Sequence, residues 1–495
     1  MAHRGDRRLR MGAAWRVFAV GGLCGVLLTC TTTTIPLTNI PIPVPDLPFR
    51  IPFFGKKDLD YSRLGWLGAF DAIHQKLAAE YPFTAHKGID WASHYEAFAP
   101  RISAAEAAED EAALYVVLLE YVYAIPDGNM GLYDDEDIRR DHIGGGLGFG
   151  VIQLDDGRVI AHILLDDGPA AAAGMQWGAE IVEYGGAPVQ NALDGTPVIW
   201  ARRPPATLAG RRIEQLRFLT RCPVDSEVGV VFKNLNAAEP VQATLRAVDD
   251  GYETLNQTYL YDSEVSDFGS PVEAKVLPSG LGYIRLHFFA PTVTTPFPAN
   301  AFKSEVASLV RKGVPGLILD VRGNSGGADD LVPKCLGHFF REPVFYEDIA
   351  IYDKEAQDFV VKEDAHLRIE PRDPYFEGPV AVLVDYSTFN AAEGVPMALQ
   401  RRPGTRIAGM SGTFGSMAVG GGYADLPDGR ALYFPVGRAL NEAGGILGEG
   451  NAAGEGGVQP DLRVPLDVDT VRAVYADGED ATLRYAEEAI LAAAP

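Results

Sequence analysis

The chain has 495 residues, which at roughly 100–200 residues per domain leaves room for several domains. With 47% hydrophobic and 22% charged residues, its composition excludes a chain that is mostly disordered or fibrous. Acidic residues outnumber basic ones by 67 to 43, giving a net charge of −24 at pH 7, which argues against nucleic acid or an anionic lipid surface as a partner.

The N-terminus has the pattern of a secretory signal. Residues 1–10 (MAHRGDRRLR) are basic, and a largely apolar run follows from Ala13 to Leu28. This run is short for a transmembrane helix, which needs about 20 apolar residues. We therefore expect residues 1–30 to direct secretion across an inner membrane, giving a periplasmic protein or a membrane-anchored lipoprotein. Cys30 resembles the acylated cysteine of a bacterial lipoprotein box, with plain cleavage nearby or an uncleaved anchor as alternatives.

Two regions precede the first specific motif. Residues 31–60 contain six prolines, and because proline fixes φ and removes a backbone donor, we expect an extended tether. Residues 61–135 are expected to be mainly helical. Within them, Ala104–Tyr123 combines good helix formers with an apolar face, which predicts a helix over this stretch.

Residues 136–250 carry two motifs that together resemble a PDZ domain. The first is the glycine-rich loop Gly146-Leu147-Gly148-Phe149, and the second is the segment from Pro169 to Val182, rich in alanine and glycine. The resemblance implies that the loop amides of Gly146, Leu147, Gly148 and Phe149 bind a peptide carboxylate. A neighbouring strand edge would then accept the peptide as an added strand. A generic small β domain with a tight turn is the alternative.

The last region has the alternation of strands and helices that favours a partly parallel α/β sheet with covered faces. The expected elements are strands at Gly280–Leu286, Gly316–Val321 and Pro379–Asp385, and helices at Ala299–Lys312 and Ala391–Gln400.

Several segments in this region resemble the C-terminal-processing (tail-specific) serine peptidases, peptidase family S41. They are GLGYIRLHFF (280–289), GLILDVRGNSGG (316–327), VLVDYSTFNAAEG (382–394), TFG (413–415), LPDGRALYFPVGRAL (426–440) and GGVQPDLRVP (456–465). The resemblance implies an α/β fold with a crotonase/ClpP-like peptidase core over residues 270–480. An inserted or preceding PDZ domain and an N-terminal helical region would complete it. Typical members are periplasmic or lumenal endopeptidases that recognise substrate C-termini.

The positions that the resemblance makes catalytic differ from the family pattern. The usual nucleophile is a serine three residues before a glutamate, and Asn390 stands at that position ahead of Glu393. The usual lysine base follows Thr-Phe-Gly, where this chain has Ser416. Another branch of the family places a histidine after Asp-Gly, and here Asn129 follows instead. The candidate catalytic positions are therefore occupied by side chains of other chemistry.

Acyl transfer needs an oxygen or sulfur nucleophile and a base, and an asparagine amide supplies neither. The oxyanion hole can survive without them, and the glycines that the resemblance places there, Gly326 and Gly327, are retained. Ser387, three residues before Asn390, and Ser416 are candidates for a relocated nucleophile. A one-residue slip in the alignment near Asn390 is a further alternative.

Three functions remain open from the sequence. The first is an active serine endopeptidase of the cell envelope, which would hydrolyse peptides with apolar C-termini. The second is a catalytically inactive PDZ scaffold or regulator, which would bind C-terminal tails of proteins without turnover. The third is a carbohydrate- or lipid-handling lipoprotein that reuses the crotonase-like fold.

The sequence predicts no metal and no cofactor. Its nine histidines and four cysteines show none of the spacings typical of metal sites. The glycine-rich loop before Phe149 leads into a predicted strand rather than a helix, and no GK[ST] motif occurs, which argues against a nucleotide. The oligomeric state is not specified by any pattern.

Overall fold

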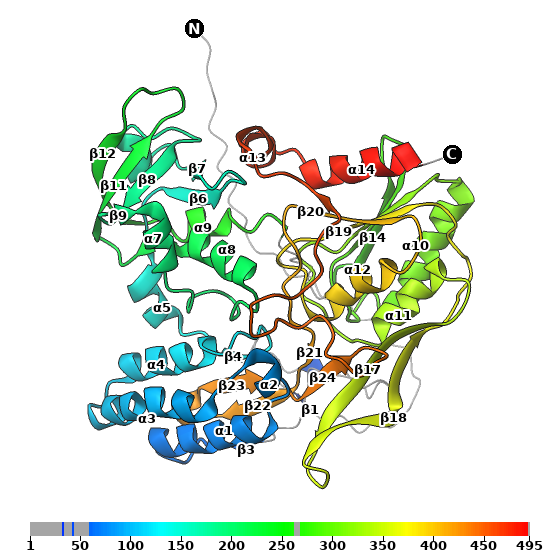
Figure 1. Ribbon diagram of the computed structural model, residues 1–495, viewed down its shortest axis with the longest axis horizontal. Helices are drawn as coiled ribbons and strands as arrows, with labels where there is room; N and C mark the ends of the chain where they lie inside the picture. Colours follow the sequence, from blue (N-terminus) through cyan, green and yellow to red (C-terminus); the bar gives the residue numbers. More distant parts are fainter. Residues whose placement is uncertain (1–31, 34–41, 44–58, 262–267, 494–495) are drawn as a thin grey trace, which may run out of the picture. The chain divides into compact units, whose positions relative to one another are not determined.

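The computed structural model describes residues 32–33, 42–43, 59–261 and 268–493 (Figure 1). The predicted signal, with Cys30, and most of the predicted tether lie outside these residues. In the N-terminal unit, β1 (Thr32–Thr33) pairs antiparallel with β2 (Ile42–Pro43). None of the helices in the described part of the chain combines the length and the apolar character that a membrane crossing requires.

Helices dominate the chain from residue 66 to residue 123. They are α1 (Trp66–Glu80), α2 (Thr84–Lys87), α3 (Trp91–Ala107) and α4 (Glu111–Tyr123). The expectation of one helix through Ala104–Tyr123 is wrong, because the helical conformation is interrupted between α3, which ends at Ala107, and α4, which begins at Glu111. Glu109 has a φ of 53°, and the carboxylate of Asp110 accepts a hydrogen bond from Ala113 N as the N-cap of α4.

These helices pack against a small sheet that comes largely from the other end of the chain. Its strands, in order, are β3 (Leu59–Asp60), β22 (Gly422–Asp425), β23 (Ala431–Phe434) and β4 (Gly131–Leu132). The helices and the sheet share one apolar core, in which Leu432 and Phe434 meet Phe70 and Leu118. The N-terminal helices are therefore part of the same folded unit as the C-terminal region (Figure 1).

The segment 145–249 forms a small β domain. The strand order of its larger sheet is β12 (Val241–Arg246), β11 (Glu227–Lys233), β8 (Glu180–Tyr184), β7 (Val159–Leu164) and β6 (Phe149–Gln153), with β9 (Ala187–Pro188) added to β8. A second sheet has the order β10 (Arg221–Cys222), β5 (Gly145–Gly146) and β13 (Val248–Asp249). The helices of and around the domain are α5 (Glu136–Ile143), α6 (Pro169–Ala172), α7 (Val189–Asp194), α8 (Leu208–Phe218) and α9 (Glu253–Asn256). Strand β6 is an edge of the larger sheet, and α8 packs beside it.

The central sheet confirms the predicted α/β region, with only small shifts at the ends of the elements. Its strand order is β14 (Val272–Val276), β15 (Gly282–Leu286), β16 (Leu317–Asp320), β19 (Val380–Leu383), β20 (Thr405–Gly409) and β25 (Leu462–Arg463). All neighbours from β15 to β25 run parallel, and β14 is antiparallel.

Helices cover both faces of this sheet, as the continuous apolar runs of its strands require. One face packs against α10 (Pro298–Lys312), α11 (Leu331–Leu336) and α12 (Gly394–Leu399). The other packs against α14 (Ala481–Ala493), as Figure 1 shows. Side chains alternate between the two cores, so that Leu317 and Leu319 face α10 while Ile318 faces α14.

The remaining elements extend this core. A four-stranded sheet has the order β18 (Asp358–Ile369), β17 (Val344–Asp353), β24 (Gly437–Leu440) and β21 (Ala418–Val419). Helix α13 (Val468–Tyr475) packs on the small β domain, and three short helical turns are η1 (Gly337–Phe339), η2 (Asn390–Glu393) and η3 (Pro427–Gly429).

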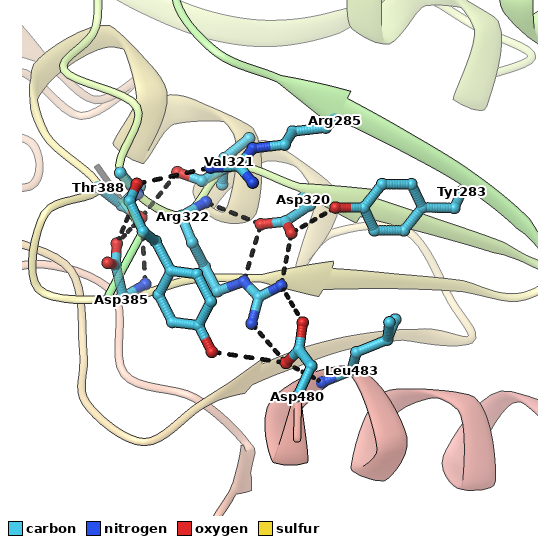
Figure 2. A network of polar contacts seen from close by, with 11 residues as sticks. Tyr283, Arg285, Asp320, Val321, Arg322, Asp385, Thr388, Asp480 and Leu483 are labelled. Carbon is cyan, nitrogen blue, oxygen red and sulfur yellow. Dashed lines mark hydrogen bonds and ion pairs between the residues drawn. The ribbon is translucent and has the colours of Figure 1, made fainter. Parts of the chain in front are cut away.

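A buried ion-pair network fixes the carboxyl end of β16 (Figure 2). Asp320 is the last residue of the strand, and its carboxylate accepts hydrogen bonds from Arg322 Nε at 2.9 Å, Arg322 Nη2 at 2.6 Å and the Tyr283 hydroxyl at 2.7 Å. Arg322 also pairs at 2.7 Å with Asp480, which immediately precedes α14. Burial alone would raise the pKa of Asp320, but Arg322 and these hydrogen bonds hold the pKa below its ordinary value.

We predict that Asp320→Asn destabilises the fold by about 3–5 kcal/mol, because it leaves the guanidinium of Arg322, itself 1% exposed, without its main counter-charge. Urea unfolding measures this loss. The matched control is Glu488→Gln, which removes an exposed carboxylate on α14, and we expect a change within about 0.5 kcal/mol. Equal, small effects of both substitutions would contradict the assigned role of the network.

Candidate functional site

The candidate site lies where the carboxyl ends of β16 and β19 meet. The two strands are parallel neighbours, with Asp320 opposite Leu383, so the loops that follow them emerge at the same edge. Hydrogen bonds join these loops: the Thr388 hydroxyl donates to Val321 O at 3.0 Å, and Phe389 N donates to Asn324 O at 3.0 Å. The loop of residues 322–327, which follows β16, is therefore joined by hydrogen bonds to the turn that precedes η2.

Asn390 is the first residue of η2 and has a backbone conformation that few residues adopt. Its φ is 54°, in the left-handed region that asparagine tolerates better than most residues. A Cβ added at Gly326 would lie 3.0 Å from the Asn390 Cβ, so the glycine allows the two loops to approach. The predicted juxtaposition of residue 390 and the diglycine segment is thus present.

The three positions that the family resemblance singled out lie in one chain of hydrogen bonds. Asn390 Nδ2 donates to Asn129 Oδ1 at 2.9 Å, and Asn129 Nδ2 donates to Ser416 Oγ at 3.1 Å. These residues come from segments almost 300 positions apart in the sequence. The structure therefore brings together Asn390, Asn129 and Ser416.

Ser416 is enclosed by the protein. Its side chain has no exposed surface, and its Oγ accepts a hydrogen bond from Gly128 N at 3.1 Å. The hydroxyl lies 2.9 Å from Asp127 Oδ1 and 3.3 Å from Glu449 Oε1, either of which accepts its proton. A substrate carbonyl has no access to this oxygen.

Glu393 holds the segment of residues 413–416 against η2. Its carboxylate accepts hydrogen bonds from the Thr413 hydroxyl at 2.5 Å, from Gly415 N at 2.8 Å, from Ser416 N at 2.9 Å and from Asn390 N at 3.2 Å. Burial raises the pKa of Glu393 to about 7, while these donors act in the opposite direction. Glu393 is thus a buried positioning group.

Next to this chain of hydrogen bonds lies a buried ion pair, Lys87 with Glu449, that no sequence motif indicates. Lys87 Nζ lies 2.7 Å from Glu449 Oε1, with both side chains fully buried, and it also donates to Pro126 O at 2.7 Å. Burial raises the pKa of Glu449 to about 8, against the opposing effect of Lys87. Glu449 sits in a glycine-rich stretch, which was the sole sequence signal available, and Lys87 comes from the short helix α2.

The predicted oxyanion hole needs one correction. Gly326 N already donates to Asn324 Oδ1 at 2.8 Å, so this amide is occupied. Within the described residues, the N–H groups of Gly327 and Ala391 have no hydrogen-bond partner. Gly327 has a φ of 141°, and a Cβ there would lie 2.2 Å from Phe289 O, so only glycine fits. The donors that flank Asn390 are therefore those of Gly327 and Ala391.

Ser387 lies apart from the hydrogen-bonded chain. It lines a cavity of about 420 Å³ between the small β domain and the central sheet, together with Ile152, Leu154, Ile213 and Tyr386. The described residues include no hydrogen-bond partner for its hydroxyl. His162 and Asp385 line the same cavity, but no hydrogen bond within the described residues joins either side chain to the Ser387 hydroxyl.

The loop predicted to bind a carboxylate is covered. Gly146, Leu147, Gly148 and Phe149 are all buried. Strands β10 and β13 flank β5, and a Cβ added at Gly146 would lie 2.4 Å from the carboxylate of Asp250. The carboxylate of Asp250, which pairs with Arg221, therefore lies beside Gly146, and carboxylate binding by these four residues stays a prediction.

No group of three or more His, Cys, Asp or Glu side chains in the described ranges has the arrangement of a metal site.

We predict that the burial of Glu393 makes stability fall as pH rises. Because its folded-state pKa of about 7 lies above the ordinary value of 4.5, the folded state binds the proton more tightly, and the free energy of unfolding decreases between these pH values. Glu393→Gln removes this contribution, on the order of 3 kcal/mol across the window. Denaturant unfolding from pH 4.5 to 7 measures the two slopes.

The control for this experiment is the exposed Glu455, whose change to Gln leaves the slope as in the wild type. Parallel pH profiles for the wild type and Glu393→Gln would show that Glu393 keeps an ordinary pKa in the fold.

Comparison with known proteins adds a family match. The sequence model of peptidase family S41 matches residues 280–464. A search of curated proteins found no match to the chain.

Solved structures share the fold. A structure of mature CPAF complexed with lactacystin has a TM-score of 0.58 at 14% identity, covering 87% of this chain and 98% of that chain. A second structure of mature CPAF has a TM-score of 0.56 at 14% identity, covering 84% and 95%. The photosystem II D1 C-terminal processing protease is 21% identical over 84% of this chain and 98% of its own, with a TM-score of 0.37. Residues 280–464 of this chain thus match peptidase family S41.

Proposed function

We propose that this protein is an S41-type protein that binds extended polypeptide tails and does not hydrolyse them. The observation that carries the proposal is the side chain of Asn390, a carboxamide that takes the nucleophile position and is hydrogen-bonded to a second carboxamide, Asn129. Neither amide titrates near neutrality, and neither supplies a nucleophile with a base. The scaffold around them, including the free amides of Gly327 and Ala391, is retained.

The alternative is hydrolysis by a relocated serine. Ser416 favours it in one respect, because its hydroxyl lies beside the carboxylates of Asp127 and Glu449, which could accept a proton. Its complete burial opposes this, since a nucleophile must come within about 3–3.5 Å of the carbonyl carbon. Ser387 is more accessible, but its hydroxyl is hydrogen-bonded to no base among the described residues. Binding without turnover is therefore the stronger proposal.

The groove beside β6 is the proposed place for the tail. In the reading of residues 136–250 as a PDZ-like domain, β6 is the free edge that accepts a strand, and α8 forms the opposite wall. The cavity there is lined by apolar side chains, Ile152 and Leu154 on one side and Ile213 and Leu216 on the other. Its volume of about 420 Å³ is large enough for several side chains of a peptide.

The cell envelope is the proposed location. The basic residues 1–10 and the apolar run that follows support export, and Cys30 is the candidate for lipidation. A tail-binding protein there would meet polypeptides that carry free C-termini.

We predict that the wild-type protein binds tail peptides with apolar ends but cleaves them no faster than buffer does. Binding is measured by fluorescence anisotropy and cleavage by chromatography of the same samples. A fluorophosphonate probe is expected to label no serine.

Ser387→Ala and Ser416→Ala separate the two alternatives. We expect no peptide cleavage by the wild type or by either variant. Ser387→Ala should bind the tail peptide as well as the wild type or slightly more weakly, because Ser387 lines the groove. Turnover by the wild type that disappears in one of these variants would identify the nucleophile and refute the proposal.

A further inference from the structure

Arg203 lies beside the candidate site, on the segment between α7 and α8. Its guanidinium carbon is 4.2 Å from the centroid of the Phe389 ring, and its Nη1 is 3.4 Å from Gly128 O. Phe389 directly precedes Asn390, and Gly128 directly precedes Asn129. The cation is thus held against the residues that immediately precede the two asparagines of the site.

The charge of Arg203 has no acidic counterpart among the described residues. Three other arginines on the following helix and strand, Arg212, Arg217 and Arg221, each form an ion pair with an Asp or Glu. Arg203 forms none, and burial lowers its pKa while the nearby Arg202 acts in the same direction. A guanidinium taken partly out of water without a counter-charge is costly, and a ligand anion would remove that cost.

Three aromatic rings in mutual contact lie between the groove and Arg203. Tyr386 lines the cavity, and its ring stacks on Phe414 with centroids 4.9 Å apart. Phe414 in turn meets Phe389 edge to face at 5.1 Å, and Arg203 lies over Phe389. These three rings form one buried cluster, with the groove at one end and Arg203 at the other.

We propose that Arg203 binds a carboxylate of the bound polypeptide beside Asn390. The inference rests on the proposed function, and it moves the carboxylate site away from the covered loop of residues 146–149. The planar fork of an arginine matches a carboxylate with two parallel hydrogen bonds. The chemistry fits a C-terminal carboxylate and an acidic side chain alike.

The test uses the full-length protein and pools of peptides of about ten residues with randomised ends. One pool has free C-terminal carboxylates, the second has C-terminal amides, and a third has free carboxylates but no Asp or Glu. Peptides retained by the protein are quantified by mass spectrometry. We expect the wild type to retain peptides of the free-acid pool about 10- to 100-fold better than their amides.

Arg203→Gln should lower the affinity for the free acids to that for the amides, so that the ratio of the two falls to about one. Arg203→Lys, which keeps the charge without the planar fork, should retain part of the ratio. Arg211→Gln is the matched control, because Arg211 is an exposed arginine on α8, and the ratio should stay as in the wild type. The ratio reports on carboxylate recognition, which a loss of packing by Arg203 alone would not change.

The outcomes distinguish the source of the carboxylate, the role of Arg203 and the proposed tail binding. Loss of retention in the third pool only would identify acidic side chains as the source of the carboxylate. Equal retention of acids and amides by the wild type, together with undiminished retention of the third pool, would refute the role of Arg203 while leaving tail binding intact. Retention of no pool would refute the proposed function itself.

Discussion

The parallel pairing of β16 with β19 is the constraint on which the site depends. It brings the diglycine loop and the turn before η2 to one edge of the sheet, where Thr388 and Asn324 join them by hydrogen bonds. The Arg322 network fixes the same edge from the other side by connecting β16 to α14. These interactions use backbone and buried side chains that are independent of the residue at position 390. The site can therefore keep its shape while its reactive groups differ.

At that position the structure has a chain of amides and a hydroxyl where acyl transfer would need a nucleophile and a base. Asn390, Asn129 and Ser416 satisfy one another, and Glu393, Asp127, Glu449 and Lys87 complete the surroundings. A fully hydrogen-bonded buried network of this kind stabilises one conformation of the cleft. The amides of Gly327 and Ala391, which have no hydrogen-bond partner among the described residues, and the cation of Arg203 all favour an electron-rich ligand group such as a carbonyl or a carboxylate.

Much of the central sheet could be predicted from the sequence, because its strands are continuous apolar runs between glycine and proline turns. GLILDVRGNSGG marks both a buried strand and the loop that follows, and the parallel order of the strands brings residue 390 to that loop. The break at Glu109 was missed, because strong helix formers on both sides concealed the capping role of Asp110. The burial of residues 146–149 was also missed, since the strands that cover this loop come from positions far along the chain. Lys87 and Arg203 reach the site by tertiary contacts alone, for which a single sequence carries no periodic signal.

The central claim is that a polypeptide bound beside Asn390 keeps its peptide bonds. Incubating the protein with a bound tail peptide in water enriched in ¹⁸O, followed by mass spectrometry of the recovered peptide, tests this claim most directly. The account predicts a full-length peptide without incorporated ¹⁸O at every time point. Shortened products that carry one ¹⁸O atom at the new carboxylate would contradict it.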